Sequence, residues 1–128
     1  MASNEIRFSR THCWVRPEGA LLVVGLTDYA QEQMGELTYV ELPEKDGHVE
    51  AEEEIAVVES AQAANDVFAP LAGTVVEVNE ALLEQPELVN QEPFDRGWLF
   101  KMKPDHPEDF AQLLEADSYE ALIPEDDE

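Results

Sequence analysis

Short runs of apolar residues recur along most of the chain, and in several of them apolar and polar positions alternate, which is typical of half-buried β-strands. In the last such run, Trp98, Phe100 and Met102 share one face. Lys101 and Lys103 share the other, so we expect core on one side and solvent on the opposite side. The segments that we predict to be strands are residues 7–16, 20–25, 37–43, 55–58, 67–71, 74–79 and 98–103.

Helical signals interrupt this pattern in the first and middle parts of the chain. Residues 27–35 begin with a capping residue, carry apolar residues at helical spacing and end at Gly35, so we predict a short helix there. Asn79 is the last residue of the strand predicted over residues 74–79, and we expect it to cap a short turn over residues 80–83.

Two more short helices are predicted near the C-terminal end. Pro107 stands near the start of a segment whose Phe110, Leu113 and Leu114 fall on one stripe. The sequence of residues 117–120, Asp-Ser-Tyr-Glu, is a capping signal for a second helix.

The most distinctive stretch is a polar insert between two apolar runs, residues 55–58 and 67–71. Its residues are small or polar, so the chain is expected to go out, turn and come back. We therefore interpret the insert as the tip of a β-hairpin.

Length and composition favour one domain. The chain has 128 residues, of which 44% are hydrophobic, and this is enough for a real core. We predict a single domain over residues 1–123 and a disordered acidic tail over residues 124–128.

The charge balance is strongly acidic. Thirty Asp and Glu residues stand against 7 Lys and Arg, which gives a formal net charge of -23. Binding to a nucleic-acid backbone depends on clustered Lys and Arg, so nucleic acid is excluded as a partner. A solvated, soluble surface accounts for so much acid, although the same field would also steer the protein toward basic docking sites on partners.

Cys13 is the only cysteine, so the chain cannot form an internal disulfide. Residues 1–7 lack the apolar run of a secretory signal. No segment approaches the roughly 20 apolar residues of a membrane span. We therefore expect a cytoplasmic protein that does not bind membranes.

Catalytic and metal sites are not predicted. If residues 7–16 form a strand, the adjacent side chains of His12 and Cys13 point to opposite faces, which disfavours a thiol nucleophile with His12 as its base. His48 and His106 lie in separate predicted loops, and no Cys and His pair has the spacing of metal ligands. Cys13 is expected to be a small, partly buried apolar side chain.

The hairpin also carries a resemblance to a known family. The segment Val58-Glu59-Ser60-Ala61-Gln62-Ala63, followed by Asp66, Pro70 and Gly73, resembles the glycine cleavage system H proteins. In that family the tip reads Val-Glu-Ser, an apolar residue, Lys-Ala, two small residues and Asp, followed by Pro and Gly. Five further motifs of the family occur in the same order, at residues 25–31, 40–43, 86–90, 93–94 and 97–98. The resemblance therefore covers about residues 7–123.

The resemblance implies both a fold and a role. The implied fold is a mainly β, lipoyl-domain-like antiparallel β-sandwich, also called a barrel-sandwich hybrid, with short helices. H proteins carry the aminomethyl group of glycine on lipoic acid between glycine decarboxylase (P protein) and aminomethyltransferase (T protein), and they also meet dihydrolipoamide dehydrogenase (L protein) and lipoylating enzymes. Such a protein is a carrier of a multienzyme system and not an enzyme.

Gln62 departs from the family at the residue that bears the lipoyl group. The family's lysine amine is acylated by lipoic acid, whereas the nitrogen of Gln62 is an amide that lacks this nucleophilicity. We therefore predict no lipoyl cofactor on this chain. Glu59, Ser60, Ala63 and Asp66 still frame the tip as the resemblance requires.

Cys13 is a second departure. The family usually reads His-Glu-Trp where this chain reads His12-Cys13-Trp14. In the family that glutamate, a hydroxyl two residues earlier and the aspartate after the lipoyl lysine hold the amine-loaded arm in a surface groove. The equivalent positions here are Cys13, Thr11 and Asp66, and a thiol with an ordinary pKa of roughly 8.5 attracts an ammonium group poorly.

Three hypotheses from different classes follow. The one that we favour is an interaction module that cannot be lipoylated but keeps the surface of a carrier. The first alternative is a genuine glycine-cleavage carrier that is altered at Gln62 or loaded elsewhere, for which Lys45 is the only lysine outside the closing strand. The second alternative is a thiol-dependent enzyme that uses Cys13.

Overall fold

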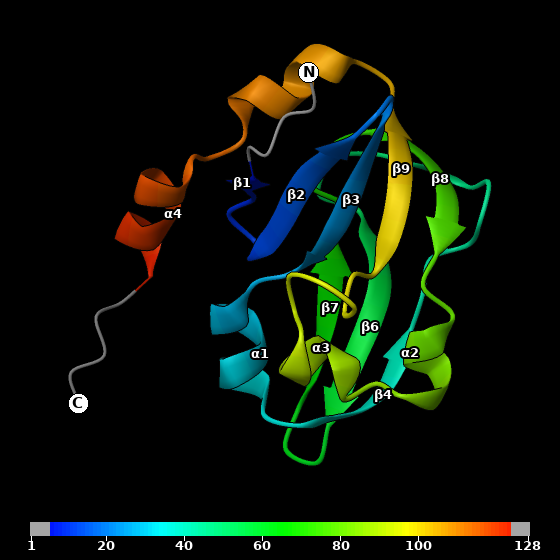
Figure 1. Cartoon of the computed structure of the whole chain (residues 1–128), viewed down its shortest axis with the longest axis vertical. Coiled ribbons are helices and arrows are strands. Elements are labelled where there is room, and N and C mark those ends of the chain that lie inside the picture. The colour runs from blue at the N-terminus through cyan, green and yellow to red at the C-terminus, as the bar shows by residue number, and fades with distance from the viewer. Residues whose placement is uncertain (1–5, 124–128) are drawn as a thin grey trace.

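The computed structural model describes residues 6–123, which form two antiparallel β-sheets with short helices at their edges (Figure 1). The larger sheet has the strand order β1-β2-β3-β9-β8-β5, and the smaller has the order β4-β6-β7. Their bounds are β1 Arg7–Phe8, β2 Cys13–Glu18, β3 Leu21–Leu26, β4 Leu37–Glu41, β5 His48–Val49, β6 Glu54–Ser60, β7 Ala64–Phe68, β8 Gly73–Val78 and β9 Phe100–Pro104. The prediction of a mainly β, antiparallel fold with short helices is confirmed.

The core lies between the two sheets. Its fully buried side chains come from both of them and include Val15, Val24, Val58, Val75 and Phe100. Each such side chain stabilises the fold by roughly 1.5–3 kcal/mol relative to an exposed position. Burial alternates along β6, β8 and β9 as the sequence pattern predicts, whereas β3 is buried on both faces from Leu22 to Leu26.

The helix predicted after the second strand is confirmed as α1, Asp28–Met34. The Thr27 side chain accepts a hydrogen bond from the Ala30 N–H, which satisfies one of the free donors at the start of the helix. At the other end Gly35 adopts φ 81°, a left-handed conformation that glycine reaches without a steric penalty. The remaining helices are α2 Ala81–Glu84, α3 Leu88–Gln91 and α4 Ala116–Leu122, and a 3-10 helix, η1, spans Pro107–Gln112.

The prediction of one strand over residues 7–16 is wrong. The chain reverses between β1 and β2, which pair antiparallel with Phe8 opposite Trp14. The Ser9 hydroxyl accepts a hydrogen bond from the Cys13 N–H at 3.1 Å, and His12 adopts φ 75° in the turn. Short hydroxyl side chains favour such local hydrogen bonds to the backbone. The Ser9–Cys13 hydrogen bond stabilises the turn over a continuous extended strand.

The C-terminal helices are present, but their details differ from the prediction. Pro107 begins a 3-10 helix, and α4 begins at Ala116, one residue before the expected cap, without a side-chain hydrogen bond at its start. Leu114 leaves the predicted stripe because its backbone exchanges two hydrogen bonds with Phe8, at 2.8 and 2.9 Å. Tyr119 of α4 is buried.

Two side chains of the middle region have other partners than expected. Asn79 does not cap a helix, because its Nδ2 donates to the carbonyl oxygens of Arg96 and Trp98 at 2.9 and 2.8 Å. Trp98 precedes β9 and is only half-buried, and the Lys101 Nζ lies 5.1 Å from the centre of its ring. Trp98 therefore does not share the core face with Phe100 and Met102.

The expected acidic tail, residues 124–128, lies outside the described residues. Among the helices between residues 6 and 123, none has both the length and the apolar character that crossing a bilayer requires.

Candidate functional site

The hairpin predicted from the sequence is formed by β6 and β7, and its tip stands at the lower end of the molecule in Figure 1. The two strands pair up to Glu59 and Ala64, and the Ser60 N–H donates to the Ala63 carbonyl at 2.8 Å. The turn itself is therefore residues 61–63, because the strands continue through polar residues that the sequence pattern assigned to the insert.

Ser60 organises this turn. Its hydroxyl oxygen accepts hydrogen bonds from the backbone N–H groups of Gln62 and Ala63 at 3.3 and 3.2 Å. The same hydroxyl donates to the Gln62 side-chain Oε1 at 3.2 Å. Such short-range bonds fix the conformation of an exposed tip that has little apolar packing of its own.

Gln62 lies at the centre of the tip, and its side chain turns back toward the end of α1. A Cβ atom placed on Gly35 would stand only 3.1 Å from the Gln62 Oε1. The residue at position 62 thus presents a neutral amide that is hydrogen-bonded to Ser60 and lies close to Gly35, at the C-terminal end of α1. The amide donates and accepts hydrogen bonds but offers no nucleophile.

The other residues expected at the tip fall on the two strands. Glu59 is half-buried on β6, opposite Ala64. Asp66 is exposed on β7, opposite Val57. The carboxylate of Asp66 is therefore presented beside the tip and not within the turn.

A cavity of about 520 Å³ lies between α1, β7 and the turn that precedes β2. We call it the hairpin groove. The structure brings Thr11, Asp66 and the tip residue Ala63 together in its lining. Apolar side chains complete the walls, among them Leu26, Met34, Val58, Val67 and Phe68. The groove is large enough for a flexible chain of small-molecule size.

Cys13 does not line the hairpin groove. Its side chain is 0% exposed, and the Sγ lies 3.7 Å from the Phe68 carbonyl oxygen. Burial raises the pKa of the Cys13 thiol to about 12, although hydrogen bonds with Ser9 and Thr11 act in the opposite direction. The thiol is thus a neutral core group, more deeply buried than the sequence indicates.

The side chains of His12 and Cys13 point away from each other in the structure, as expected. The reason differs, because His12 lies in a turn and Cys13 begins β2. The His12 Nδ1 lies 2.8 Å from the Tyr119 hydroxyl, while Cys13 faces the core. Within residues 6–123, no group of three His, Cys, Asp or Glu side chains is arranged to hold a metal ion.

Sequence reasoning missed a hydrogen-bonded chain beside the groove. The Tyr119 hydroxyl lies 2.8 Å from both the His12 Nδ1 and the Thr27 Oγ1, and His12 lines the groove. Burial lowers the pKa of His12 and raises that of Tyr119. Tyr119 is 107 residues from His12, so no local pattern signals their contact.

Comparison with known proteins gives concordant matches over nearly the whole chain. The family model described as "Glycine cleavage H-protein" matches residues 6–126. A glycine cleavage system H protein from Acinetobacter baylyi is 49% identical over 118 residues, which cover 92% of this chain and 95% of that relative. One from Thermus thermophilus is 49% identical over 116 residues, or 91% of each chain.

A solved structure is similar as well. The crystal structure of a glycine cleavage system H protein from Mycobacterium marinum superposes with a TM-score of 0.83 at 32% identity. The superposition covers 93% of this chain and 96% of that one. The similarity therefore extends over nearly the whole of both chains.

Proposed function

This chain belongs to the glycine cleavage H-protein family, and because Gln62 lies at the tip of its hairpin we propose that it acts as a non-lipoylated interaction module. The fold is accordingly that of a lipoyl-type domain. Members of the family carry lipoic acid, work with the P, T and L proteins of the glycine cleavage system, and are carriers rather than catalysts.

Gln62 is the observation that carries the proposal. We infer that it occupies the position of the family's lipoyl lysine, because it follows Val58-Glu59-Ser60-Ala61 and precedes Ala63 at the hairpin tip. Acylation requires an amine, and the lone pair of the Gln62 nitrogen is delocalised into its carbonyl. The tip therefore does not fit a covalently attached lipoyl group, and we assign no cofactor to this chain.

The surroundings of Gln62 support a retained docking surface. Ser60 still holds the turn, and Glu59 and Asp66 still flank it. The groove beside the tip keeps Thr11 and Asp66 in its lining. We propose that this surface meets glycine decarboxylase, aminomethyltransferase, dihydrolipoamide dehydrogenase or a lipoylating enzyme in the cytoplasm.

Lipoylation is tested by mass spectrometry after co-expression with an active lipoyl ligase. The intact chain should gain no lipoyl mass, whereas Gln62→Lys should be acylated at residue 62, because the tip would then present an amine. A lipoyl group on any residue of the unaltered chain would refute the proposal. An unmodified Gln62→Lys variant that folds normally would show that the geometry of the tip also differs from that of a lipoylated carrier.

Docking is tested separately with the purified partner enzymes. Asp66→Lys should weaken binding of the chain to its partner, because it reverses a charge beside the tip. Glu84→Lys makes the same charge change on the exposed surface of α2 and should have a smaller effect. If the unaltered chain binds none of the four enzymes, or if the two variants behave alike, the hairpin surface is not a docking site.

One observation favours the alternative of a carrier that is loaded elsewhere. Lys45 is exposed and lies within a turn that the hydrogen bond from the Gly47 N–H to the Glu44 carbonyl closes at 3.1 Å, so the turn centres on Lys45 and Asp46. However, the Asp46 N–H donates to the Val75 carbonyl of β8, so this turn is attached to the larger sheet and not to the hairpin. Peptide mapping that finds a lipoyl group on Lys45 would establish this alternative.

A further inference from the structure

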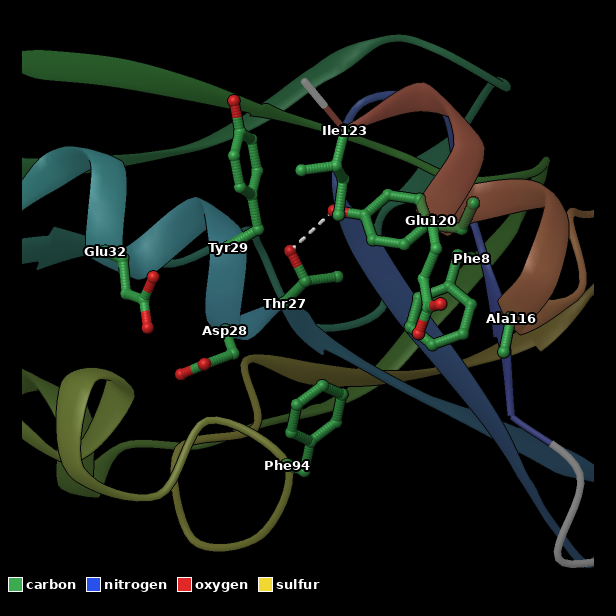
Figure 2. Close-up of a pocket in the computed structure, with 10 residues that line it drawn as sticks. Phe8, Thr27, Asp28, Tyr29, Glu32, Phe94, Ala116, Glu120 and Ile123 are labelled. Atoms are coloured by element: carbon green, nitrogen blue, oxygen red, sulfur yellow. Dashed lines mark hydrogen bonds between the residues drawn. The ribbon is translucent and has the colours of Figure 1, made fainter. Parts of the chain in front are cut away.

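A second cavity, of about 280 Å³, lies between the start of α1 and the C-terminal helix α4 (Figure 2). We call it the α1–α4 cavity. It is distinct from the hairpin tip and does not include Gln62. Figure 2 shows Tyr29, Asp28 and Glu32 on one side, Glu120 and Ile123 on the other, and Phe94 below.

Aromatic rings form much of the wall. Phe8 stacks on Tyr119 with ring centres 4.7 Å apart, and Phe94 packs on Trp14 at 5.8 Å. The Tyr119 hydroxyl is already bonded to Thr27, so Tyr119 offers the cavity its ring and not a free polar group. Phe94 is 38% exposed, so part of its ring is open to a ligand in the cavity.

Carboxylates surround these rings. Asp28, Glu32 and Glu120 all line the cavity, and none of the ion pairs formed between residues 6 and 123 includes any of them. The charge of Asp28 raises the pKa of Glu32, because the two carboxylates repel each other. A cation placed between them would relieve this repulsion.

We propose that the α1–α4 cavity is a docking site for a single arginine side chain that a partner protein presents. A planar guanidinium group stacks on aromatic faces and donates to two carboxylates at once, whereas an ammonium group acts only as a point charge. The methylene stem of arginine would cover the exposed face of Phe94. The net charge of -23 would attract such a basic partner to this surface.

The size of the cavity agrees with one side chain. Sites for drug-sized ligands and cofactors usually measure about 300–1,000 Å³, and this cavity is just below that range. The proposal goes beyond the role of the hairpin, since the cavity would be the same in a chain that carried a lysine at position 62.

The test is a nuclear magnetic resonance titration of the full, isotope-labelled chain with N-acetyl-arginine methylamide at an ionic strength of about 10 mM, where screening is weak. The lysine and citrulline counterparts serve as comparison ligands, because citrulline keeps the shape of arginine without its charge. We expect saturable shifts at Tyr29, Glu32 and Glu120, strongest with arginine, weaker with lysine and absent with citrulline. Shifts spread over the whole acidic surface, or equal shifts with citrulline, would overturn the proposal.

Two variants separate a specific site from general attraction. Glu32→Gln should weaken arginine binding about two- to fivefold, the range of a solvent-exposed ion pair. Glu84→Gln on α2 removes the same charge away from the cavity and should leave binding nearly unchanged. Equal effects of the two variants would mean that only the net charge matters.

Phe94→Leu tests the aromatic wall. It keeps an apolar side chain but removes the ring, so the preference for arginine over lysine should narrow. If Phe94→Leu leaves that preference unchanged, the guanidinium does not stack on this ring and the assignment to arginine fails.

Discussion

The burial of Cys13 depends on the turn formed by the residues immediately before it. The Ser9 hydroxyl accepts the Cys13 N–H, the chain reverses, and the thiol enters the core beneath Phe68. The sequence alone predicts only a partly buried side chain at this position. The turn therefore determines whether position 13 faces the core or the solvent.

We predict that the Cys13 thiol does not ionise in the folded chain between pH 7 and pH 10. Burial raises its pKa to about 12, so the reactive thiolate is absent in that range. The pKa of Cys13 is higher in the folded chain than in the unfolded chain. The contribution of the Cys13 thiol to the free energy of unfolding is therefore complete below the unfolded pKa, roughly 8.5, and declines as pH rises toward 12. The checks are thiolate absorbance and the rate of reaction with a disulfide reagent, each compared with the unfolded chain.

At the scale of elements, the Tyr119 side chain links α4 to the rest of the fold, through a ring that stacks on Phe8 and through a hydroxyl group. Its hydroxyl joins Thr27, which caps α1, to His12 beside the hairpin groove. Three segments that are distant in sequence thus meet at one oxygen atom. Loss of that atom should loosen the contact of α4 with the rest of the fold.

We predict that Tyr119→Phe lowers the free energy of unfolding by about 1–3 kcal/mol, because it removes two hydrogen bonds, one to the buried Thr27 hydroxyl and one to the partly buried His12 ring. Tyr39→Phe is the matched control, since Tyr39 is 48% exposed on β4. The measurements are urea denaturation and hydrogen exchange of the α4 amides. Equal effects of the two variants would contradict a structural role for the Tyr119 hydroxyl.

The edge strand β5 provides a pH-dependent contact. The His48 Nε2 lies 2.6 Å from the Asp105 carboxylate, which follows β9, and this hydrogen bond raises the pKa of His48. The pKa of His48 is therefore higher in the folded chain than in the unfolded chain. The His48–Asp105 contact contributes fully to stability below the unfolded pKa of His48, roughly 6.5, and this contribution is lost as pH rises through the folded pKa.

We predict that Asp105→Asn lowers the pKa of His48 and removes this part of the pH dependence of stability. The pKa is measured from the nuclear magnetic resonance shift of the His48 ring, and stability from thermal unfolding at several pH values above 6. An unchanged His48 pKa in the variant would show that the contact does not form in solution.

At the scale of the whole molecule, charge acts against compactness. With a formal charge of -23, like charges repel across the surface of the folded chain. We predict that adding salt, from about 10 mM to 150 mM, raises the midpoint of thermal unfolding, because screening over about 8 Å weakens this repulsion. A midpoint that falls over this range would mean that favourable ion pairs outweigh the repulsion.

The sequence predicts the parts of the fold that depend on neighbouring residues. The hairpin, α1 with its Thr27 cap, and the core positions of β8 and β9 follow from local alternation and capping. The position of Gln62 at the tip follows from the same local pattern. The burial of Cys13 and the link between His12 and Tyr119 do not, because they depend on contacts between segments that only the folded chain brings together.

The pairing of Phe8 with Leu114 has a consequence for the order of events during synthesis. These residues are 106 positions apart, so at roughly 5–20 residues per second the ribosome needs about 5–20 s to supply the second after the first. During that interval Phe8 has neither its backbone partner nor the ring of Tyr119 to cover it. A nascent chain can therefore pair one edge of β1 with β2, but the other edge stays uncovered for that interval and is open to a chaperone.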